Sequence, residues 1–291
     1  MTHDPRLRHV SCLDPRGLHR MAYWEWGDPA CPEVVVCVHG LTRQGRDFDT
    51  LAADLVAAGR RVVCPDVVGR GRSDWLADPM GYAVPTYVAD MVTLLARLDA
   101  RQVDWVGTSM GGLIGLGVAA LEGSPVRRLV LNDVGPALQL AALQRIGAYL
   151  GRSGRFESPE QAAEAMWAIS QGFGPHTPEQ WLALTRPLLK PDGSGGFVLR
   201  YDPAIAVPFR ALTPELAALG EAALWRAYDS LGLPTLVLRG AESDLLSRET
   251  AREMTLRGPR ARVLEFEGVG HAPTLVQADQ RQAVREFLLA P

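Results

Sequence analysis

Lysine is almost missing from this chain of 291 residues, which has 30 basic side chains and Lys190 as its one lysine. The arginines are scattered along the sequence, and the formal net charge is −3. A protein that binds a phosphate backbone presents a clustered basic face. The composition therefore argues against a nucleic-acid partner and favours a small-molecule substrate.

Cysteine is also scarce, with four residues in the whole chain: Cys12, Cys31, Cys37 and Cys64. None of them forms a C-x-x-C pair, and a disulfide framework is unusual in a chain of this length. Cys37 and Cys64 lie inside apolar runs, where a reduced cysteine behaves as a small hydrophobic residue. We expect no metal and no cofactor.

Long apolar runs are absent as well, since no stretch of 18 apolar residues occurs to span a membrane. The first ten residues are polar and charged, without the apolar core of a signal peptide. We expect a cytoplasmic protein without a membrane partner, either a monomer or a homodimer.

Short apolar runs are what the sequence has instead. Residues 6–13 and 18–26 flank a turn sequence and predict an N-terminal antiparallel hairpin. Continuous apolar runs alternating with helical patterns then predict a doubly wound, mostly parallel α/β sheet with helices on both faces. The predicted buried strands are 34–38, 61–64, 103–106, 128–131, 235–238 and 262–266. The predicted helices between and after them are 48–58, 84–98, 111–121 and 278–289.

One segment, 136–231, interrupts this alternation. It contains helix starts in which a hydroxyl residue is followed by proline and glutamate, at Ser158, Thr177 and Thr213. We interpret it as a helical cap inserted into a core made of residues 1–135 and 232–291. A cap at this point would lie over the carboxyl ends of the strands, where open α/β sheets bind ligands.

The strongest local motif is G-x-S-x-G, from Gly107 to Gly111, placed between a strand and a helix. A nucleophile on such a tight turn needs small residues two positions to either side. Ser109 is the predicted nucleophile, and the Met110 N–H, at a helix N-terminus, is a candidate oxyanion donor.

A second motif, from His39 to Thr42, ends the strand 34–38. The Leu41 N–H could supply the second oxyanion donor. His39 could be mistaken for a catalytic base, but we expect it to hold this loop by hydrogen bonds beside the substrate. Arg43 could bind a substrate carboxylate, or be an exposed loop residue.

The predicted base is His271, which follows the last strand and so lies at the same sheet edge as Ser109. The other histidines, His3, His9, His19 and His176, are expected at the surface.

Two aspartates could orient the base. Asp133 follows the strand 128–131, and Asp244 follows the strand 235–238. Both come between Ser109 and His271 in the chain, so the order of the residues does not separate them.

The glycine-rich stretch from Gly69 to Ser73 resembles half of a dinucleotide fingerprint. Its third glycine is replaced by Asp74 and no helix opens there, so we interpret it as a structural turn.

Taken together, these motifs resemble the α/β-hydrolase superfamily along almost the whole chain. The motifs are the H-G-x-x segment, the D-x-x-G-x-G-x-S segment from Asp66 to Ser73, G-x-S-x-G, the turn before Asp244 and the late G-H. The cap resembles that of lid-bearing esterases, lactonases and C–C hydrolases. In this family the acid normally follows the strand after the cap, which favours Asp244 and leaves Asp133 as the alternative position. Serine at position 109 argues against the dehalogenase and epoxide hydrolase branches, which carry aspartate there.

The resemblance implies a Ser-His-Asp serine hydrolase that cleaves a carboxylic ester or lactone of a small to medium substrate. Hydrolysis of a C–C bond in a ring-cleavage product is one alternative. A weakly catalytic ligand receptor on the same scaffold is another. Aromatic residues of the cap could line the pocket, although most are expected to form the core of the cap: Trp167, Phe173, Trp181, Phe197, Tyr201, Phe209, Trp225 and Tyr228.

Overall fold

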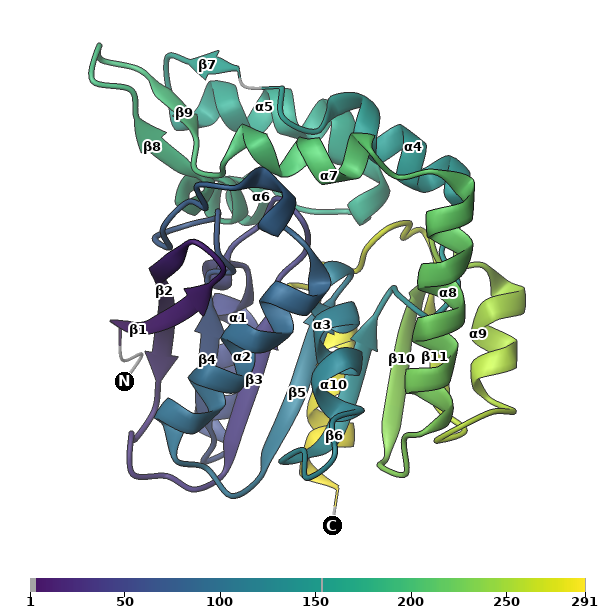
Figure 1. Ribbon diagram of the computed structural model, residues 1–291. Coiled ribbons are helices and arrows are strands. Elements are labelled where there is room, and N and C mark those ends of the chain that lie inside the picture. The colour runs from purple at the N-terminus through teal and green to yellow at the C-terminus, as the bar shows by residue number, and fades with distance from the viewer. Residues whose placement is uncertain (1–3, 153, 291) are drawn as a thin grey trace.

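The computed structural model describes residues 4–152 and 154–290, and its centre is an eight-stranded sheet (Figure 1). The strand order is β1-β2-β4-β3-β5-β6-β10-β11. All pairs from β4 to β11 are parallel, while β1 and β2 are antiparallel to their neighbours. The strands of this sheet are β1 Arg6–Asp14, β2 Gly17–Trp26, β3 Val34–Val38, β4 Arg61–Pro65, β5 Val103–Thr108, β6 Val126–Asn132, β10 Thr235–Gly240 and β11 Arg262–Phe266. The predicted hairpin and mostly parallel sheet are confirmed.

Helices cover both faces of the sheet because successive side chains of each buried strand point to opposite faces. On β3, Val34, Val36 and Val38 pack in one hydrophobic cluster and Val35 and Cys37 in the other. The first face is covered by α2 Val84–Leu98, α3 Met110–Ala119, α8 Pro214–Asp229 and α9 Arg248–Met254. The second is covered by α1 Asp49–Ala57 and α10 Ala278–Leu289. No helix in the described ranges combines the length and apolar character needed to cross a lipid bilayer.

The segment between β6 and β10 forms a layer over the carboxyl ends of the strands (Figure 1). The α-helices of this layer are α4 Leu140–Tyr149, α5 Pro159–Ser170, α6 Pro178–Thr185 and α7 Ala206–Arg210, and α8 follows them in the segment. As predicted, Ser158 and Thr177 cap α5 and α6, and Thr213 caps α8.

Two features of this segment differ from the expectation of a purely helical insertion. It contains a small antiparallel sheet with the order β7-β9-β8, formed by β7 Arg155–Phe156, β8 Leu189–Pro191 and β9 Phe197–Leu199. Helix α8 packs against α3 of the core, where Trp225 and Tyr228 join the main hydrophobic cluster. The chain therefore returns to the core before residue 231.

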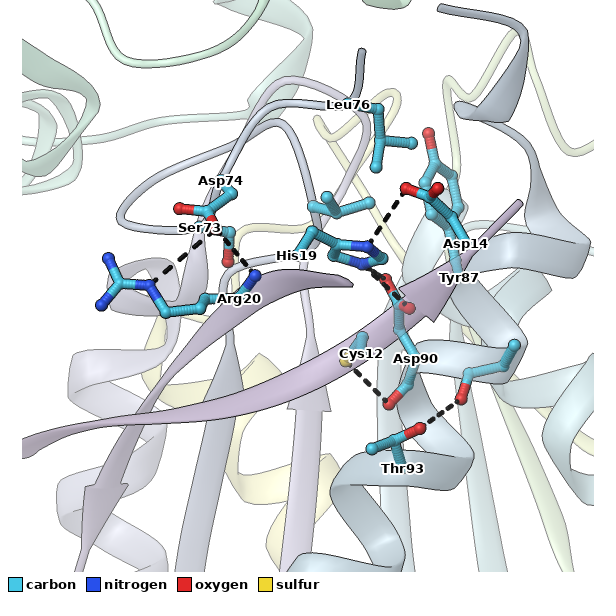
Figure 2. A network of polar contacts seen from close by, with 12 residues as sticks. Cys12, Asp14, His19, Arg20, Ser73, Asp74, Leu76, Tyr87, Asp90 and Thr93 are labelled. Carbon is cyan, nitrogen blue, oxygen red and sulfur yellow. Dashed lines mark hydrogen bonds and ion pairs between the residues drawn. The ribbon is translucent and has the colours of Figure 1, made fainter. Parts of the chain in front are cut away.

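A buried polar network fastens the N-terminal hairpin to α2 (Figure 2). The His19 Nε2 lies 3.0 and 3.1 Å from the carboxylate oxygens of Asp90, and its Nδ1 lies 3.3 Å from Asp14 Oδ2. His19 is 5% exposed, so the expectation that it lies at the surface is wrong. The hydrogen bonds between His19 and Asp90 offset part of the cost of burying these polar groups between the hairpin and the helix. His9 is exposed, and His3 lies outside the described residues.

Candidate active site

Ser109 occupies a sharp turn between β5 and α3. Its backbone has φ +51° and ψ −117°, a conformation that non-glycine residues rarely adopt. The turn is held because the Ser109 N–H donates to the Asn132 carbonyl at the end of β6, 2.9 Å away. The hydroxyl of Ser109 faces the cavity beneath the cap.

The two glycines of the motif allow this turn to form. A Cβ on Gly107 would come 2.3 Å from the Gly111 carbonyl oxygen, and one on Gly111 would come 1.9 Å from the Val38 carbonyl oxygen. Both distances are far below van der Waals contact. The spacing G-x-S-x-G therefore follows from backbone crowding around the serine.

His271 and Asp133 continue a chain of hydrogen bonds from Ser109. The His271 Nε2 lies 2.9 Å from Ser109 Oγ, and its Nδ1 lies 2.7 Å from Asp133 Oδ2. With its proton on Nδ1, the imidazole donates to the carboxylate and accepts from the serine hydroxyl. This is the arrangement by which a base can remove the hydroxyl proton.

Asp133 is fully buried and its carboxylate is held from three sides. Besides His271, it accepts the Ser243 hydroxyl at 2.6 Å and the Gly240 N–H at 2.9 Å. The Asp133 N–H donates to the Leu238 carbonyl, and its φ is +55°. The ends of β6 and β10 thus fix the carboxylate beside the imidazole.

The preference for Asp244 as the partner of His271 is not what the structure gives. Asp244 is about half exposed and pairs with Arg145 of α4, with Nη2 and Oδ2 2.7 Å apart. It lies four residues beyond the end of β10, whereas Asp133 directly follows β6. Backbone bonds from the sheet aim Asp133 at the imidazole, and the alternative acid position is the one in contact with His271.

The predicted oxyanion loop lies beside the serine. A Cβ built on Gly40 would be 3.7 Å from the Cβ of Ser109, so this glycine lets the loop approach closely. Met110 opens α3, and the first N–H groups of a helix have no acceptor within the helix. Leu41 follows Gly40 in this loop and Met110 follows Ser109 in the chain, and their role as oxyanion donors stays a prediction.

His39 fixes this loop by hydrogen bonds to the backbone. Its Nδ1 donates to the Gly40 carbonyl at 2.7 Å, and its Nε2 accepts the Val67 N–H at 3.0 Å. The ring is fully buried, and burial lowers the pKa of His39 to about 3. Both nitrogens of this neutral ring are used by the backbone, which fits the expected structural role.

The cavity above Ser109 has a volume of about 610 Å³ and lies between the core and the cap. Apolar side chains from both parts line it: Phe48, Ile146, Met166, Ile169, Phe173, Leu184 and Leu199. Polar side chains also line it, among them Ser109, His271 and Asp47. A mostly apolar cavity with a few convergent polar groups is typical of a site for a small organic ligand.

Of the residues predicted to contact substrate, Tyr201 and Arg43 line the cavity, as does His39. Arg43 is not free for a substrate carboxylate, because its guanidinium already binds Asp47 through two hydrogen bonds of 2.6 and 2.9 Å. Trp167 does not line this cavity and packs edge-on against Trp181, with ring centroids 5.1 Å apart.

Among the other aromatic residues of the cap, Phe173 lines the cavity, while Trp181, Trp225 and Tyr228 are buried in hydrophobic clusters. Tyr149 lines it as well and was not anticipated. Tyr149 lies on the helix α4 beside the site, but the sequence of this helix does not show which of its faces points into the cavity. His176 is partly buried and bonds to Thr274, so it too is not a simple surface residue.

One group of metal-binding side chain types occurs in the described chain. Potential ligand atoms of Cys12, His19 and Asp90 lie within 4.8 Å of one another beneath the hairpin (Figure 2). Asp90 is already bound by His19, and burial raises the pKa of the Cys12 thiol to about 12, which opposes the thiolate that a metal needs. The group fits a structural network and lies away from Ser109.

The chain is similar to known hydrolases in sequence and in structure. A model of the alpha/beta hydrolase family matches residues 35–287. The chain is 58% identical over 290 residues to the 3-hydroxybutyrate-oligomer hydrolase of Cupriavidus necator, with 99% of each chain covered. It is 29% identical to an esterase of Mycobacterium tuberculosis, covering 90% of this chain and 83% of the esterase. A solved α/β hydrolase from Novosphingobium aromaticivorans superposes with a TM-score of 0.85 at 34% identity, with 98% of each chain covered.

Proposed function

Because this chain belongs to the α/β-hydrolase family and is a hydrolase of ester bonds, we propose that Ser109, His271 and Asp133 are its catalytic triad. The observation that carries the proposal is the unbroken chain of hydrogen bonds from Ser109 Oγ through the imidazole to the buried carboxylate. A serine with a positioned base and a third group that orients the base is the arrangement of nucleophilic acyl transfer.

In the first half of the reaction, Ser109 Oγ attacks the ester carbonyl while its proton passes to His271 Nε2. The tetrahedral intermediate then collapses, and the same nitrogen returns the proton to the departing alkoxide. This leaves the acyl group on Ser109. In the second half, water loses a proton to His271 Nε2 as it attacks the acyl carbon. When the second tetrahedral intermediate collapses, His271 returns this proton to Ser109 Oγ and the acid is released. Asp133 keeps the Nδ1 proton in place throughout and stabilises the imidazolium.

The negative charge that develops on the carbonyl oxygen needs donors that are already oriented. The N–H groups of Leu41 and Met110 supply them in this proposal, one from the loop after β3 and one from the start of α3. Removing a single oxyanion donor in other enzymes costs about 3–4 kcal/mol of transition-state stabilisation.

For the substrate we propose short linear esters of hydroxy acids, with oligomers of 3-hydroxybutyrate as the leading candidate. The support is the similarity, along the entire chain, to a hydrolase of those oligomers. The cavity volume of about 610 Å³ lies in the usual range of small-ligand sites, roughly 300–1,000 Å³. Its apolar lining suits a chain of methyl-branched ester units.

We further propose that residues 136–212 act as the cap and that α8 belongs to the core. The helices α4 to α7 and the small sheet lie over the carboxyl ends of the core strands, whereas α8 packs against α3. The cavity is lined by residues of both parts, among them Ile146 and Phe173 from the cap. The cap would then select the substrate while the core performs the chemistry.

The test measures release of 3-hydroxybutyrate from the linear trimer, with p-nitrophenyl butyrate and a diketone as comparison substrates. We expect hydrolysis of both esters and none of the diketone. Ser109→Ala should reduce kcat by about 10⁶-fold and abolish labelling by a fluorophosphonate.

A matched control is Ser170→Ala, since Ser170 also lines the cavity but lies outside the proposed triad. This variant should keep its labelling and most of its activity. Labelling that survives in Ser109→Ala would refute the nucleophile. Turnover of the butyrate ester without turnover of the trimer would refute the substrate class and leave the triad standing.

A further inference from the structure

We propose that Arg70, in the glycine-rich turn after β4, is a positioning residue that holds both sides of the oxyanion hole. The inference rests on the proposed function, because it concerns the same serine site. It gives a role to the stretch from Gly69 to Ser73, which resembles half of a dinucleotide fingerprint and which the reaction itself does not use.

The guanidinium of Arg70 contacts the two residues that carry the proposed oxyanion donors. Its Nε donates to the Leu41 carbonyl at 2.8 Å, and its Nη2 lies 3.4 Å from the Met110 sulfur. Its Nη1 donates to the Val68 carbonyl at 2.7 Å and to the Tyr87 hydroxyl at 2.9 Å. One planar group thus ties the loop after β3 to the residue that follows the nucleophile, and fixes both to α2.

Arg70 is fully buried, yet within the described ranges no aspartate or glutamate lies at ion-pair distance from it. Carbonyl oxygens, a sulfur and the faces of two tyrosine rings surround its charge instead. The guanidinium carbon lies 5.0 Å from the centroid of the Tyr87 ring and 5.7 Å from the centroid of the Tyr82 ring. Burying a cation without a carboxylate partner is costly. Such a cation near the oxyanion donors favours the state in which negative charge forms there.

The field of this charge reaches the oxyanion loop. Arg70 is one of the groups that lower the pKa of His39, after the larger effect of burial. His39 bonds to the Gly40 carbonyl next to Leu41, so the charge of Arg70 acts on the loop that carries this proposed donor.

The same turn is also joined to the cap. The Gly71 N–H donates to the Arg200 carbonyl, and the Asp202 N–H donates to the Gly69 carbonyl at 2.8 Å. An isolated bridge links Arg70 to Tyr201, which lines the cavity. The backbone of Arg70 is therefore held from the cap side while its side chain supports the hole.

The test compares Arg70→Lys, which keeps the charge, with Arg70→Gln, which keeps a planar donor without charge. Each is assayed with p-nitrophenyl butyrate, for kcat and KM, and with butylboronic acid. The boronate binds Ser109 Oγ as a tetrahedral anion and so reports on the oxyanion hole without turnover. We expect kcat to fall by about 10- to 100-fold in both variants, since neither reproduces the contacts to Leu41 and Met110. The boronate inhibition constant should rise by a similar factor, and KM should change by less than about threefold.

The control is Arg61→Met, because Arg61 is also buried but pairs with Glu25 at the other end of the sheet strands. This variant should lower the melting temperature and leave kcat and boronate affinity within about twofold of the wild type. Arg70 variants that behave like Arg61→Met, or that change KM alone, would overturn the proposal. Activity that survives Ser109→Ala would instead overturn the proposed function.

Two less disruptive substitutions test the same proposal if the Arg70 variants do not fold. Tyr87→Phe removes one hydrogen bond from Arg70, and Tyr228→Phe removes a comparable buried bond, to the Met254 carbonyl, away from the site. We expect a parallel loss of kcat and boronate affinity, about threefold, in Tyr87→Phe only. Equal behaviour of the two variants would count against the positioning role.

Discussion

Replacing Asp133 by asparagine changes one atom of the proposed triad and little of the fold. Asparagine tolerates the positive φ of this position, and its remaining oxygen can still accept the Gly240 N–H. The amide nitrogen, however, takes the place of the oxygen that faces His271 Nδ1 at 2.7 Å. A donor there favours the imidazole tautomer with its proton on Nε2, which cannot accept the Ser109 proton.

The size of the effect follows from the loss of the correct tautomer. The same substitution in a trypsin-like triad lowers kcat by about 10⁴-fold. At 25 °C this factor corresponds to about 5.5 kcal/mol of activation free energy. We expect a loss of this order for Asp133→Asn, with KM for p-nitrophenyl butyrate nearly unchanged.

The matched control is Asp244→Asn, which replaces the other aspartate at this edge of the sheet. Asp244 is about half exposed, and an exposed ion pair with Arg145 contributes about 0–1 kcal/mol. We expect kcat within about threefold of the wild type. Steady-state kinetics on both variants, with melting curves to verify folding, decide the question. A large loss in Asp244→Asn together with near-normal Asp133→Asn would refute the assignment.

Two further predictions concern stability. Burial lowers the pKa of His39 from 6.5 to about 3, so the folded state binds fewer protons than the unfolded state between these values, and stability falls as the pH drops below 6.5. At pH 5 protonation of this group lowers the free energy of unfolding by about 2 kcal/mol. In urea unfolding, the free energy of unfolding of His39→Gln should therefore fall less between pH 6.5 and pH 5 than that of the wild type. An equal fall in both proteins would contradict this prediction. In Gly111→Ala the new Cβ would meet the Val38 carbonyl oxygen at 1.9 Å, and we expect the free energy of unfolding to fall by about 3 kcal/mol or more. The exposed helical Gly220 has open space around it, so Gly220→Ala should instead stabilise the protein by up to about 1 kcal/mol; equal effects of the two substitutions would be inconsistent with the crowding at Gly111.

Much of the fold could be predicted because its signals are local. The run at 34–38 is apolar on both faces and the run at 103–106 is apolar apart from Asp104, and the structure buries both between two layers of helices. The strands of the small cap sheet have two or three residues each, which is too short for an alternating pattern to be seen. The return of α8 to the core depends on tertiary packing of Trp225 and Tyr228, which aromatic content alone does not reveal.

The candidate site also has residues that the sequence predicts and residues that it does not. Ser109 and its glycines form a motif whose spacing is fixed by backbone contacts, so the sequence was sufficient to find it. The carboxylate partner of His271 was harder to predict, because β6 and β10 are neighbours in the sheet and each is followed by an aspartate at the same edge. The hydrogen bonds of Asp133 to Gly240, Ser243 and His271 show which carboxylate turns inward. The burial of His19 was missed because its partner Asp90 is far away in the chain.

The two edges of the cap are fastened to the core by different kinds of contact. On one side, Asp202 bonds through its backbone to Gly69 and through its carboxylate to the Tyr82 hydroxyl at 2.5 Å, all of it buried. On the other side, the Gln139 N–H donates to the Leu245 carbonyl at 3.1 Å, and the exposed pair of Arg145 and Asp244 lies near it. An exposed pair of this kind weakens as the salt concentration rises. Rising salt should therefore weaken the Arg145 edge of the cap more than the Asp202 edge, where the contacts are buried. The ionic strength of the buffer then becomes a variable that acts on one edge of the cap and leaves the hydrogen bonds around Ser109 unchanged.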